Sequence, residues 1–229
     1  VKTGDVCGDI EPNVTEDCIF VLDGVPVGFY IRNINTYNAR CSMAIEIANQ
    51  EFLSKRVPKA VMTRSSALNA RREGGKGVEQ YSTILGYVPP KPHMRRAYAT
   101  ISSVHSVPSA KRFIKAMLVA CSESEKIIKN LTPNIYDRQL KLITENVPKR
   151  FRFGKLFTSS ISNYNISASF HRDSANIKDC VNVIIAKKQS ARGGNTTVPD
   201  YNATVDSCNN SMLVYPAWKN VHGVTPITQ

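Results

Sequence analysis

The sequence lacks several patterns that mark common classes of protein. Its 229 residues contain no run of about 18 apolar residues, so no membrane-spanning helix is expected. The six cysteines include no Cys-x-x-Cys pair, so zinc-ribbon spacing is absent, and we expect reduced thiols in an intracellular protein. We see no signal-peptide pattern at the start of the sequence, so we do not expect the Asn-x-Ser/Thr triplets to be glycosylated.

Histidine is scarce, and this narrows the search for a metal site. Only four histidines occur, and two of them, His171 and His222, lie at the ends of β-prone runs. Side chains alternate faces along a strand, so His171 and Asp173 should share one face while Arg172 points to the other. With His222 they offer two imidazoles and one carboxylate, the set that leaves cis positions open on non-haem Fe(II). The alternative is two unconnected histidines.

Short β-prone runs separate the two histidines. They cover residues 181–186, 195–199 and 211–215, and Gly193-Gly194 precedes the second run. Upstream, residues 158–169 alternate small polar with apolar side chains, which is typical of a strand lining a polar cavity. We expect a β-meander across which the two histidines face each other.

The earlier part of the chain predicts a hairpin and three helices. Residues 19–31 read as two apolar strands around an Asp23-Gly24 turn. Ser42 is expected to cap a helix reaching about Ser54, residues 109–131 give the longest helix, and Pro133 opens another that runs to about Glu145. On the longest helix Glu123 and Glu125 are expected to lie off the apolar stripe. That stripe comprises Phe113, Ile114, Met117, Leu118, Cys121, Ile127, Ile128 and Leu131.

The chain is strongly basic. Its net charge is +12 and its pI about 9.5, which favours binding to phosphate backbones by release of counterions. The basic, glycine-containing segment 64–77 reads as a loop that would touch such a backbone, and Arg95 or Arg96 would contact nucleic acid or a co-substrate. The alternatives are a solvated basic surface without a partner and, around Arg95, a structural connector.

A group of motifs in about the last third of the chain resembles one enzyme family. The string His171-Arg-Asp173, the Gly-Gly turn leading to Pro199, the strand at 212–215 and His222-Gly-Val-Thr-Pro-Ile227 resemble the double-stranded β-helix core of the TET/JBP family. Members of that family are Fe(II)- and 2-oxoglutarate-dependent oxygenases that oxidise the 5-methyl group of pyrimidines in nucleic acid. The resemblance implies an α+β fold with a jelly-roll, cupin-like core at residues 149–229. Residues 1–148 would supply the hairpin and supporting helices, packed on this core as one compact unit.

The resemblance also implies roles for particular residues. His171, Asp173 and His222 would bind Fe(II) and form the catalytic centre. Asn176 stands at the offset of the family's base-reading asparagine and would contact a flipped base, whereas the alternative is a turn-forming asparagine. The strand at 158–169 would border the co-substrate, with Ser160, Asn163 and Asn165 as candidates.

The sequence departs from the family pattern in one respect. In the family an arginine follows the distal histidine by roughly ten or more residues and anchors 2-oxoglutarate as a bidentate pair, but none follows His222 here. Either that arginine lies beyond Gln229, or another residue holds the acid, or the co-substrate is different, such as ascorbate. Because the sequence opens at Val1 and stops within an expected strand pair, we expect a trimmed fragment or ordered segments joined across missing loops.

The resemblance implies oxidation of 5-methylcytosine in methylated DNA, with the target base flipped into the site and hydrogen abstracted from its methyl carbon. The protein would be intracellular, and nuclear in a eukaryote. The preference for 5-methylcytosine rests on the string from His171 to Asn176, which looks closer to the TET branch. Three alternatives stay open: a thymine hydroxylase, an Fe(II) oxygenase acting on protein or a small metabolite, and a catalytically silent DNA- or RNA-binding module.

Overall fold

The computed structural model describes residues 1–61, 80–91 and 97–228, and the chain divides into two compact units. The β unit comprises Val1–Thr36, Val61–Tyr81 and Tyr164–Gln229, and the helical unit comprises Tyr37–Ala60 and Ser82–Asn163. Both units draw segments from before and after residue 148. The predicted loop at 64–77 lies outside the described residues. In the part that is described, no helix is long and apolar enough to cross a membrane.

Two four-stranded antiparallel sheets build the β unit. The strand order is β1-β2-β12-β8 in one sheet and β11-β10-β13-β7 in the other, while β9 pairs with β14. The strands of these sheets are β1 (Cys18–Leu22), β2 (Val25–Ile31), β7 (Ala168–His171), β8 (Asn182–Ala186), β9 (Arg192–Gly193), β10 (Thr196–Val198), β11 (Ala203–Val205), β12 (Ser211–Tyr215), β13 (His222–Val224) and β14 (Ile227–Thr228). The 3-10 turn η5 (Pro199–Tyr201) joins β10 to β11.

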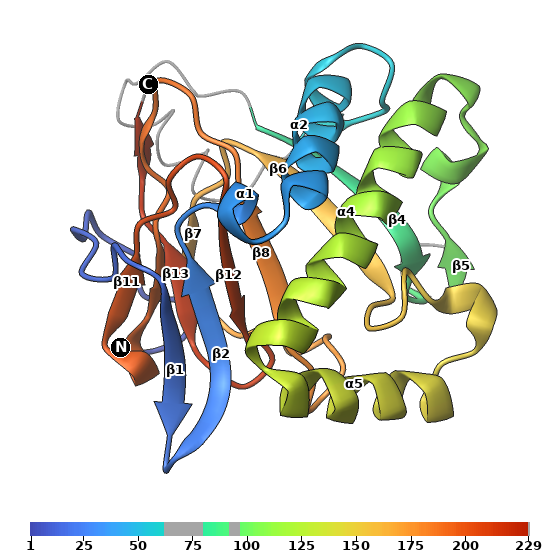
Figure 1. Cartoon of the computed structure of the whole chain (residues 1–229). Coiled ribbons are helices and arrows are strands. Elements are labelled where there is room, and N and C mark those ends of the chain that lie inside the picture. The colour runs from blue at the N-terminus through green and yellow to red at the C-terminus, as the bar shows by residue number, and fades with distance from the viewer. Residues whose placement is uncertain (62–79, 92–96, 229) are drawn as a thin grey trace. The chain divides into compact units, whose positions relative to one another are not determined.

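The two sheets share one hydrophobic core. Tyr30, Leu213 and Tyr215 from the first sheet pack with Val198 and Val205 from the second. From β7 onward the chain passes back and forth between the sheets. Strands β7, β10, β11 and β13 belong to the second sheet, whereas β8 and β12, which come between them in the sequence, belong to the first. Figure 1 shows β12 and β8 beside β2 in one layer and β13 beside β7. Histidines far apart in the sequence therefore reach neighbouring strands.

The predicted hairpin at residues 19–31 is confirmed. Strands β1 and β2 pair antiparallel, and the two residues between them, Asp23 and Gly24, have φ values of 49° and 77°. Positive φ at both central positions is the geometry of a type I′ turn, which Asp-Gly adopts readily and which matches the twist of the strands. The local turn chemistry thus places β2, whose Tyr30 then pairs with Leu213 of β12.

Three helices and a small sheet build the helical unit. Helices α2 and α4 pack together, with the Phe52 and Phe113 rings stacked at 6.2 Å and Cys41 Sγ 3.5 Å from Ser124 Oγ. The helices are α2 (Ala39–Leu53), α4 (Lys111–Leu131) and α5 (Pro133–Asn146), with the 3-10 turns η2 (Ser103–Ser106), η3 (Pro108–Ala110) and η4 (Lys149–Phe151). The short α1 (Ile34–Tyr37) ends at the first residue of this unit and otherwise belongs to the β unit. The strands are β3 (Ala60–Val61), β4 (Tyr81–Val88), β5 (Thr100–Ile101) and β6 (Ser159–Tyr164), and β3, β5 and β6 all pair with β4. Helices and antiparallel sheets thus occur together, as an α+β chain requires.

The predicted start of the first long helix is wrong by four residues. Asn38 rather than Ser42 is the N-cap, because its side-chain oxygen accepts a hydrogen bond from Cys41 N at 2.9 Å. Ser42 lies inside the helix, where its own N–H donates to Asn38 O. Asparagine caps a helix as well as serine does, so the earlier candidate in the chain defines the first turn.

The expected apolar stripe of α4 is correct in its centre and wrong at its edges. Phe113, Ile127 and Ile128 are buried, but Leu118 is 40% exposed. Glu123 and Glu125, expected outside the stripe, are 5% and 4% exposed. Each is buried because it has partners: Glu123 accepts from Lys126 Nζ at 2.9 Å, and Glu125 Oε1 accepts the backbone N–H groups of Lys155 and Leu156 at 2.6 and 2.9 Å.

Two buried tyrosines of the β unit provide a matched test of this core. Tyr30 O–H donates to Asp206 O at 2.6 Å, whereas Tyr215 O–H is buried with no hydrogen-bond partner in the described part of the chain. Tyr30→Phe should lower the free energy of unfolding by about 1 kcal/mol, and Tyr215→Phe should leave it unchanged or raise it, because no hydrogen bond is removed there. Urea unfolding of both variants measures this, and equal losses would contradict the assigned hydrogen bonding.

Candidate metal centre

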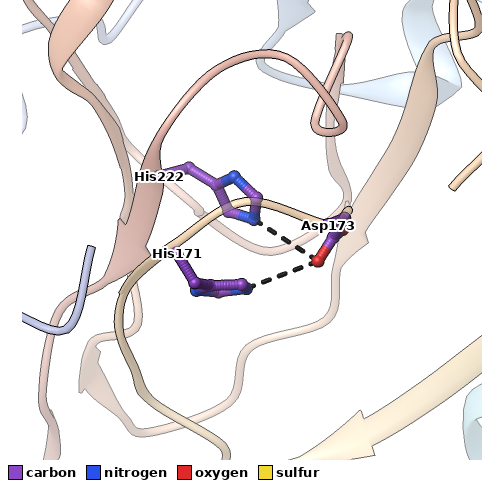
Figure 2. Close-up of side chains that lie close together, drawn as sticks. All are labelled: His171, Asp173 and His222. Carbon is purple, nitrogen blue, oxygen red and sulfur yellow. Dashed lines mark ion pairs between the residues drawn. The ribbon is translucent and has the colours of Figure 1, made fainter. Parts of the chain in front are cut away.

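The pairing of β7 with β13 brings two histidines together. In this antiparallel pair His171 stands directly opposite His222, and the ring centroids are 4.3 Å apart at an interplanar angle of 55°. Directly opposite residues on paired strands have their side chains on the same face, at close range. Figure 2 shows both imidazoles on one side of the strands, directed toward Asp173.

Asp173 completes the cluster from the segment after β7. Its N–H donates to Ala217 O at 3.1 Å, and its Oδ1 lies 3.5 Å from His171 Nε2 and 3.9 Å from His222 Nε2. Figure 2 draws both ion pairs to that one oxygen. Arg172 is engaged elsewhere, since its Nε donates to Lys219 O. One ligand atom from each of the three residues lies within 4.8 Å of the others, so the group can hold a metal ion such as iron.

Hydrogen bonds to the backbone fix the tautomer of each histidine. His171 Nδ1 lies 2.7 Å from Ser169 O, and His222 Nδ1 lies 3.0 Å from Asn220 O. A carbonyl oxygen only accepts, so Nδ1 carries the hydrogen in both rings and each neutral imidazole presents the lone pair of Nε2. Two nitrogen lone pairs and a carboxylate oxygen then face one another with no hydrogen among them. Only a cation, either a proton or a metal ion, makes that arrangement favourable, and the donor set therefore fits a metal.

The cluster is buried on one side and open on the other. The side chain of His222 is 6% exposed, while those of His171 and Asp173 are each 38% exposed. Burial lowers the pKa of His222 and so favours the neutral ring that a metal needs. Burial alone would raise the pKa of Asp173. When a proton occupies the cluster in place of a metal ion, the His171 hydrogen bond and the charges of the imidazoles, together with the Asn176 hydrogen bond, outweigh burial and lower this pKa. Asp173 is therefore ionised at neutral pH.

A second layer of contacts holds His222, and no sequence pattern indicated it. Asn220 is 4% exposed; its Oδ1 accepts from Tyr201 O–H at 2.9 Å, and its Nδ2 donates to Asp200 Oδ2 at 2.8 Å. The same residue supplies the carbonyl that fixes the ring of His222. Such outer contacts orient metal ligands. They were not readable from the sequence, because they join η5 to the segment before β13, which is about twenty residues further along the chain.

Tyr215 is another residue that sequence reasoning missed. Its ring meets the His222 ring edge-on, with centroids 5.4 Å apart and an angle of 79°. The residue is fully buried, and burial raises the pKa of its phenol, with the Asp173 charge adding to the effect. The phenol therefore stays protonated beside the cluster. In the sequence it reads only as the end of an apolar strand.

Asn176 lies next to the cluster. Its N–H donates to Asp173 O at 2.9 Å, and its side-chain Nδ2 donates to Asp173 Oδ2 at 3.3 Å. The first contact is that of a turn residue, and the second directs the Asp173 carboxylate so that Oδ1 faces the histidines. Contact with a substrate base stays a prediction for this residue.

The other candidate residues lie elsewhere. Ser160 and Asn163 are on β6 of the helical unit, where Asn163 Oδ1 accepts from Ser82 O–H at 2.9 Å. Asn165 belongs to the β unit, has a φ of 53° and accepts from Gln80 Nε2 through its carbonyl. Arg95 and Arg96 fall outside the described residues. A co-substrate or DNA role for these residues stays a prediction.

Comparisons with known proteins place few limits on this chain. No protein-family model matches it, and no curated protein sequence matches it. Among solved structures, that of OsALKBH1 is similar over 92% of this chain and 88% of the other, at 14% sequence identity and a TM-score of 0.40. A likeness at that level assigns neither a family nor a function.

Removing any one ligand should abolish metal binding. In His171→Ala, Asp173→Ala or His222→Ala two donors remain, and affinity for Fe(II) should fall by more than the roughly 10- to 100-fold that loss of an outer contact causes. Titration calorimetry under anaerobic conditions measures the affinity, and circular dichroism verifies that the fold persists. Asp9→Ala, which removes an exposed carboxylate from the same unit, is the matched control and should bind as wild type. Wild-type affinity in a ligand variant would disprove the assignment.

The lowered pKa of His222 also makes the metal-free protein sensitive to acid. Above the unfolded-state pKa of about 6.5 the histidine is neutral in both states. As pH falls below that value, the unfolded state binds the proton first, because its pKa is the higher one. Stability is therefore lost until the pH has passed the lower folded-state pKa as well. Unfolding free energy should therefore decline from about pH 7 toward about pH 5. The decline should be smaller in His222→Gln, which retains the similar contribution of His105, whose pKa burial also lowers. Parallel profiles for wild type and His222→Gln would contradict this.

Proposed function

We propose that this chain is an Fe(II)-dependent dioxygenase that oxidises the 5-methyl group of 5-methylcytosine in DNA. One observation carries the metal part of the proposal: His171, Asp173 and His222 converge with ligand atoms within 4.8 Å. The motifs shared with the TET/JBP family support the methylated pyrimidine as substrate. The net charge of +12 supports a polyanionic partner, since a small metabolite would not require it.

The fold of the β unit supports this assignment. Two four-stranded sheets pack against each other, and from β7 onward the chain passes between them repeatedly, which resembles a double-stranded β-helix. The two histidines come from adjacent strands of one sheet, and the carboxylate comes from the turn after the first of them. A rigid sheet therefore supplies the imidazoles, and a turn tied down through Ala217 supplies the acid.

The residues of the chain divide the chemical tasks. His171, Asp173 and His222 would hold one face of the iron and leave other positions free for a co-substrate and O2. When bound, iron supplies the oxygen activation that abstracts a methyl hydrogen. The Nδ1 bonds to Ser169 and Asn220 keep both rings in the ligating tautomer, so binding needs no ring flip. The half-exposed side formed by His171 and Asp173 is the side from which a substrate can enter.

A methyl group inside a duplex cannot reach such a centre, so the nucleotide would be flipped out. Asn176 is suited to read the flipped base. One amide hydrogen is directed to Asp173 Oδ2, and the second hydrogen and the amide oxygen are available for the base edge. The residue would thus orient a ligand carboxylate and contact the substrate with one side chain.

Nucleoside mass spectrometry tests the function directly. The protein is incubated with Fe(II) and methylated DNA, with 2-oxoglutarate in one arm and ascorbate in another. We expect loss of 5-methylcytosine and appearance of an oxidised product in one arm, and none with His171→Ala. Oxidation of thymine in unmethylated DNA at an equal rate would replace the substrate with thymine. Binding of Fe(II) without oxidation of any nucleoside would remove nucleic acid as the substrate class.

The same assay separates the two roles of Asn176. If it also reads the base, Asn176→Ala should lower turnover even at saturating Fe(II), by a factor that corresponds to the loss of a hydrogen bond of about 1–3 kcal/mol. If it acts only on Asp173, Fe(II) affinity should fall by about 10- to 100-fold, and saturating Fe(II) should restore turnover. Asn176→Asp is the companion variant, because it removes the donor and places a second negative charge beside Asp173.

A further inference from the structure

The net positive charge of this chain comes from one of its two units. The helical unit contains 18 lysines and arginines against 6 acidic residues, a net charge of +12. The β unit, which carries the candidate metal centre, contains 12 basic and 12 acidic residues and is neutral. The whole net charge of the chain therefore belongs to the helical unit.

Burial of acidic residues makes the surface of the helical unit more basic still. Glu51, Glu123 and Glu125, half of its acids, are 2%, 5% and 4% exposed. Glu51 is held by Arg56 through two hydrogen bonds of 2.8 and 2.9 Å, with Arg112 at 3.4 Å. Glu123 accepts a hydrogen bond from Lys126, and Glu125 accepts hydrogen bonds from two backbone N–H groups. These carboxylates repel no external anion at close range, because their charge is compensated inside the unit.

One segment offers basic side chains without acidic partners. Lys149 and Arg150 in η4 and Lys155 just after it are exposed, and none forms an ion pair with any described residue. The segment is held in place, because Arg152 donates to Val147 O and Thr144 O at the end of α5, and the N–H of Lys155 donates to Glu125. We call Lys149, Arg150 and Lys155 the basic segment.

We propose that the helical unit, through this basic segment, binds the phosphate backbone of nucleic acid. The inference rests on the proposed function in naming nucleic acid, and it assigns backbone binding and methyl oxidation to different units. Lysine and arginine side chains that lack carboxylate partners gain most from phosphate, because binding releases condensed counterions and breaks no internal pair.

The segment favours nucleic acid over an anionic membrane. Membrane-surface segments combine basic residues with exposed apolar anchors that enter the lipid. Here both aromatic residues between Lys149 and Lys155 are engaged. Phe153 is buried, and Phe151 has the Arg150 guanidinium 4.8 Å from its ring centroid and the Tyr87 ring edge-on at 5.3 Å. Without an apolar anchor, a charged backbone is the better match.

Fluorescence anisotropy with a short DNA duplex tests the proposal on the full chain. Lys149→Gln/Arg150→Gln is compared with Lys2→Gln/Arg192→Gln, which removes one exposed lysine and one exposed arginine from the β unit. Removal of one phosphate-binding side chain should reduce the slope of log K against log salt by about 0.9, hence by about 1.8 for the first variant and by nothing for the control. Thermal unfolding verifies that both variants keep the fold; a small loss of stability is expected in the first, because Arg150 also lies over the Phe151 ring.

Three results would overturn the proposal. Equal weakening by both variants would show that charge acts without a defined surface, and wild-type binding by the Lys149/Arg150 variant would show that the surface lies elsewhere. Binding to phosphatidylserine vesicles in preference to DNA would make the partner a membrane. If the Lys149/Arg150 variant binds DNA as wild type does and the protein still oxidises 5-methylcytosine, the proposed function stands and only the binding surface is wrong. If the wild-type protein binds no DNA even at low salt, both the binding proposal and the proposed function are wrong.

Discussion

The register between β7 and β13 is the constraint on which the candidate centre depends. A slip of one residue would turn His171 or His222 to the opposite face of the sheet and separate the ligands. Strand β7 is held on both edges: His171 pairs with His222 on one side, and on the other Phe170 exchanges hydrogen bonds with Gly4 and Asp5. Packing of Phe170 with Cys7 and Val221 adds an apolar contact beneath the pair. A Cβ at position 223 would lie only 3.0–3.1 Å from side-chain atoms of Cys7 and Phe170, so Gly223 allows this close packing. The N-terminal segment, which has no readable pattern, thus supports the strand that carries the first ligand.

The centre is also prepared electrostatically. Backbone carbonyls select one tautomer in each ring, a hydrogen bond from Asn176 orients the carboxylate, and burial keeps His222 neutral. These contacts leave three acceptors facing each other, an arrangement that a bound cation relieves. A metal ion bound at this candidate site would stabilise the folded chain, because only the folded chain brings the three side chains together.

The two units differ in how their acidic residues are balanced and buried. In the β unit acids and bases balance, and the acid that matters most, Asp173, faces histidines. In the helical unit half of the acids are buried against basic partners or backbone N–H groups, which ties α2 to α4 through Glu51 and its contact with Arg112. The same burial removes negative charge from the surface. One feature of the helical packing therefore contributes both to stability and to attraction of a polyanion.

The sequence alone determined the features that depend on a few neighbouring residues. Asp23-Gly24 specified the hairpin because its turn needs positive φ at both positions, and the apolar period and Pro133 specified α4 and α5. The ligand types at 171, 173 and 222 were also readable, since alternation along a strand is local. The tertiary structure alone decided that Glu123 and Glu125 are buried, that Asn220 holds His222, that Tyr215 lies against that ring, and which strands are neighbours. Each of these depends on a partner many residues away along the chain, and local backbone preference carries no information about such a partner.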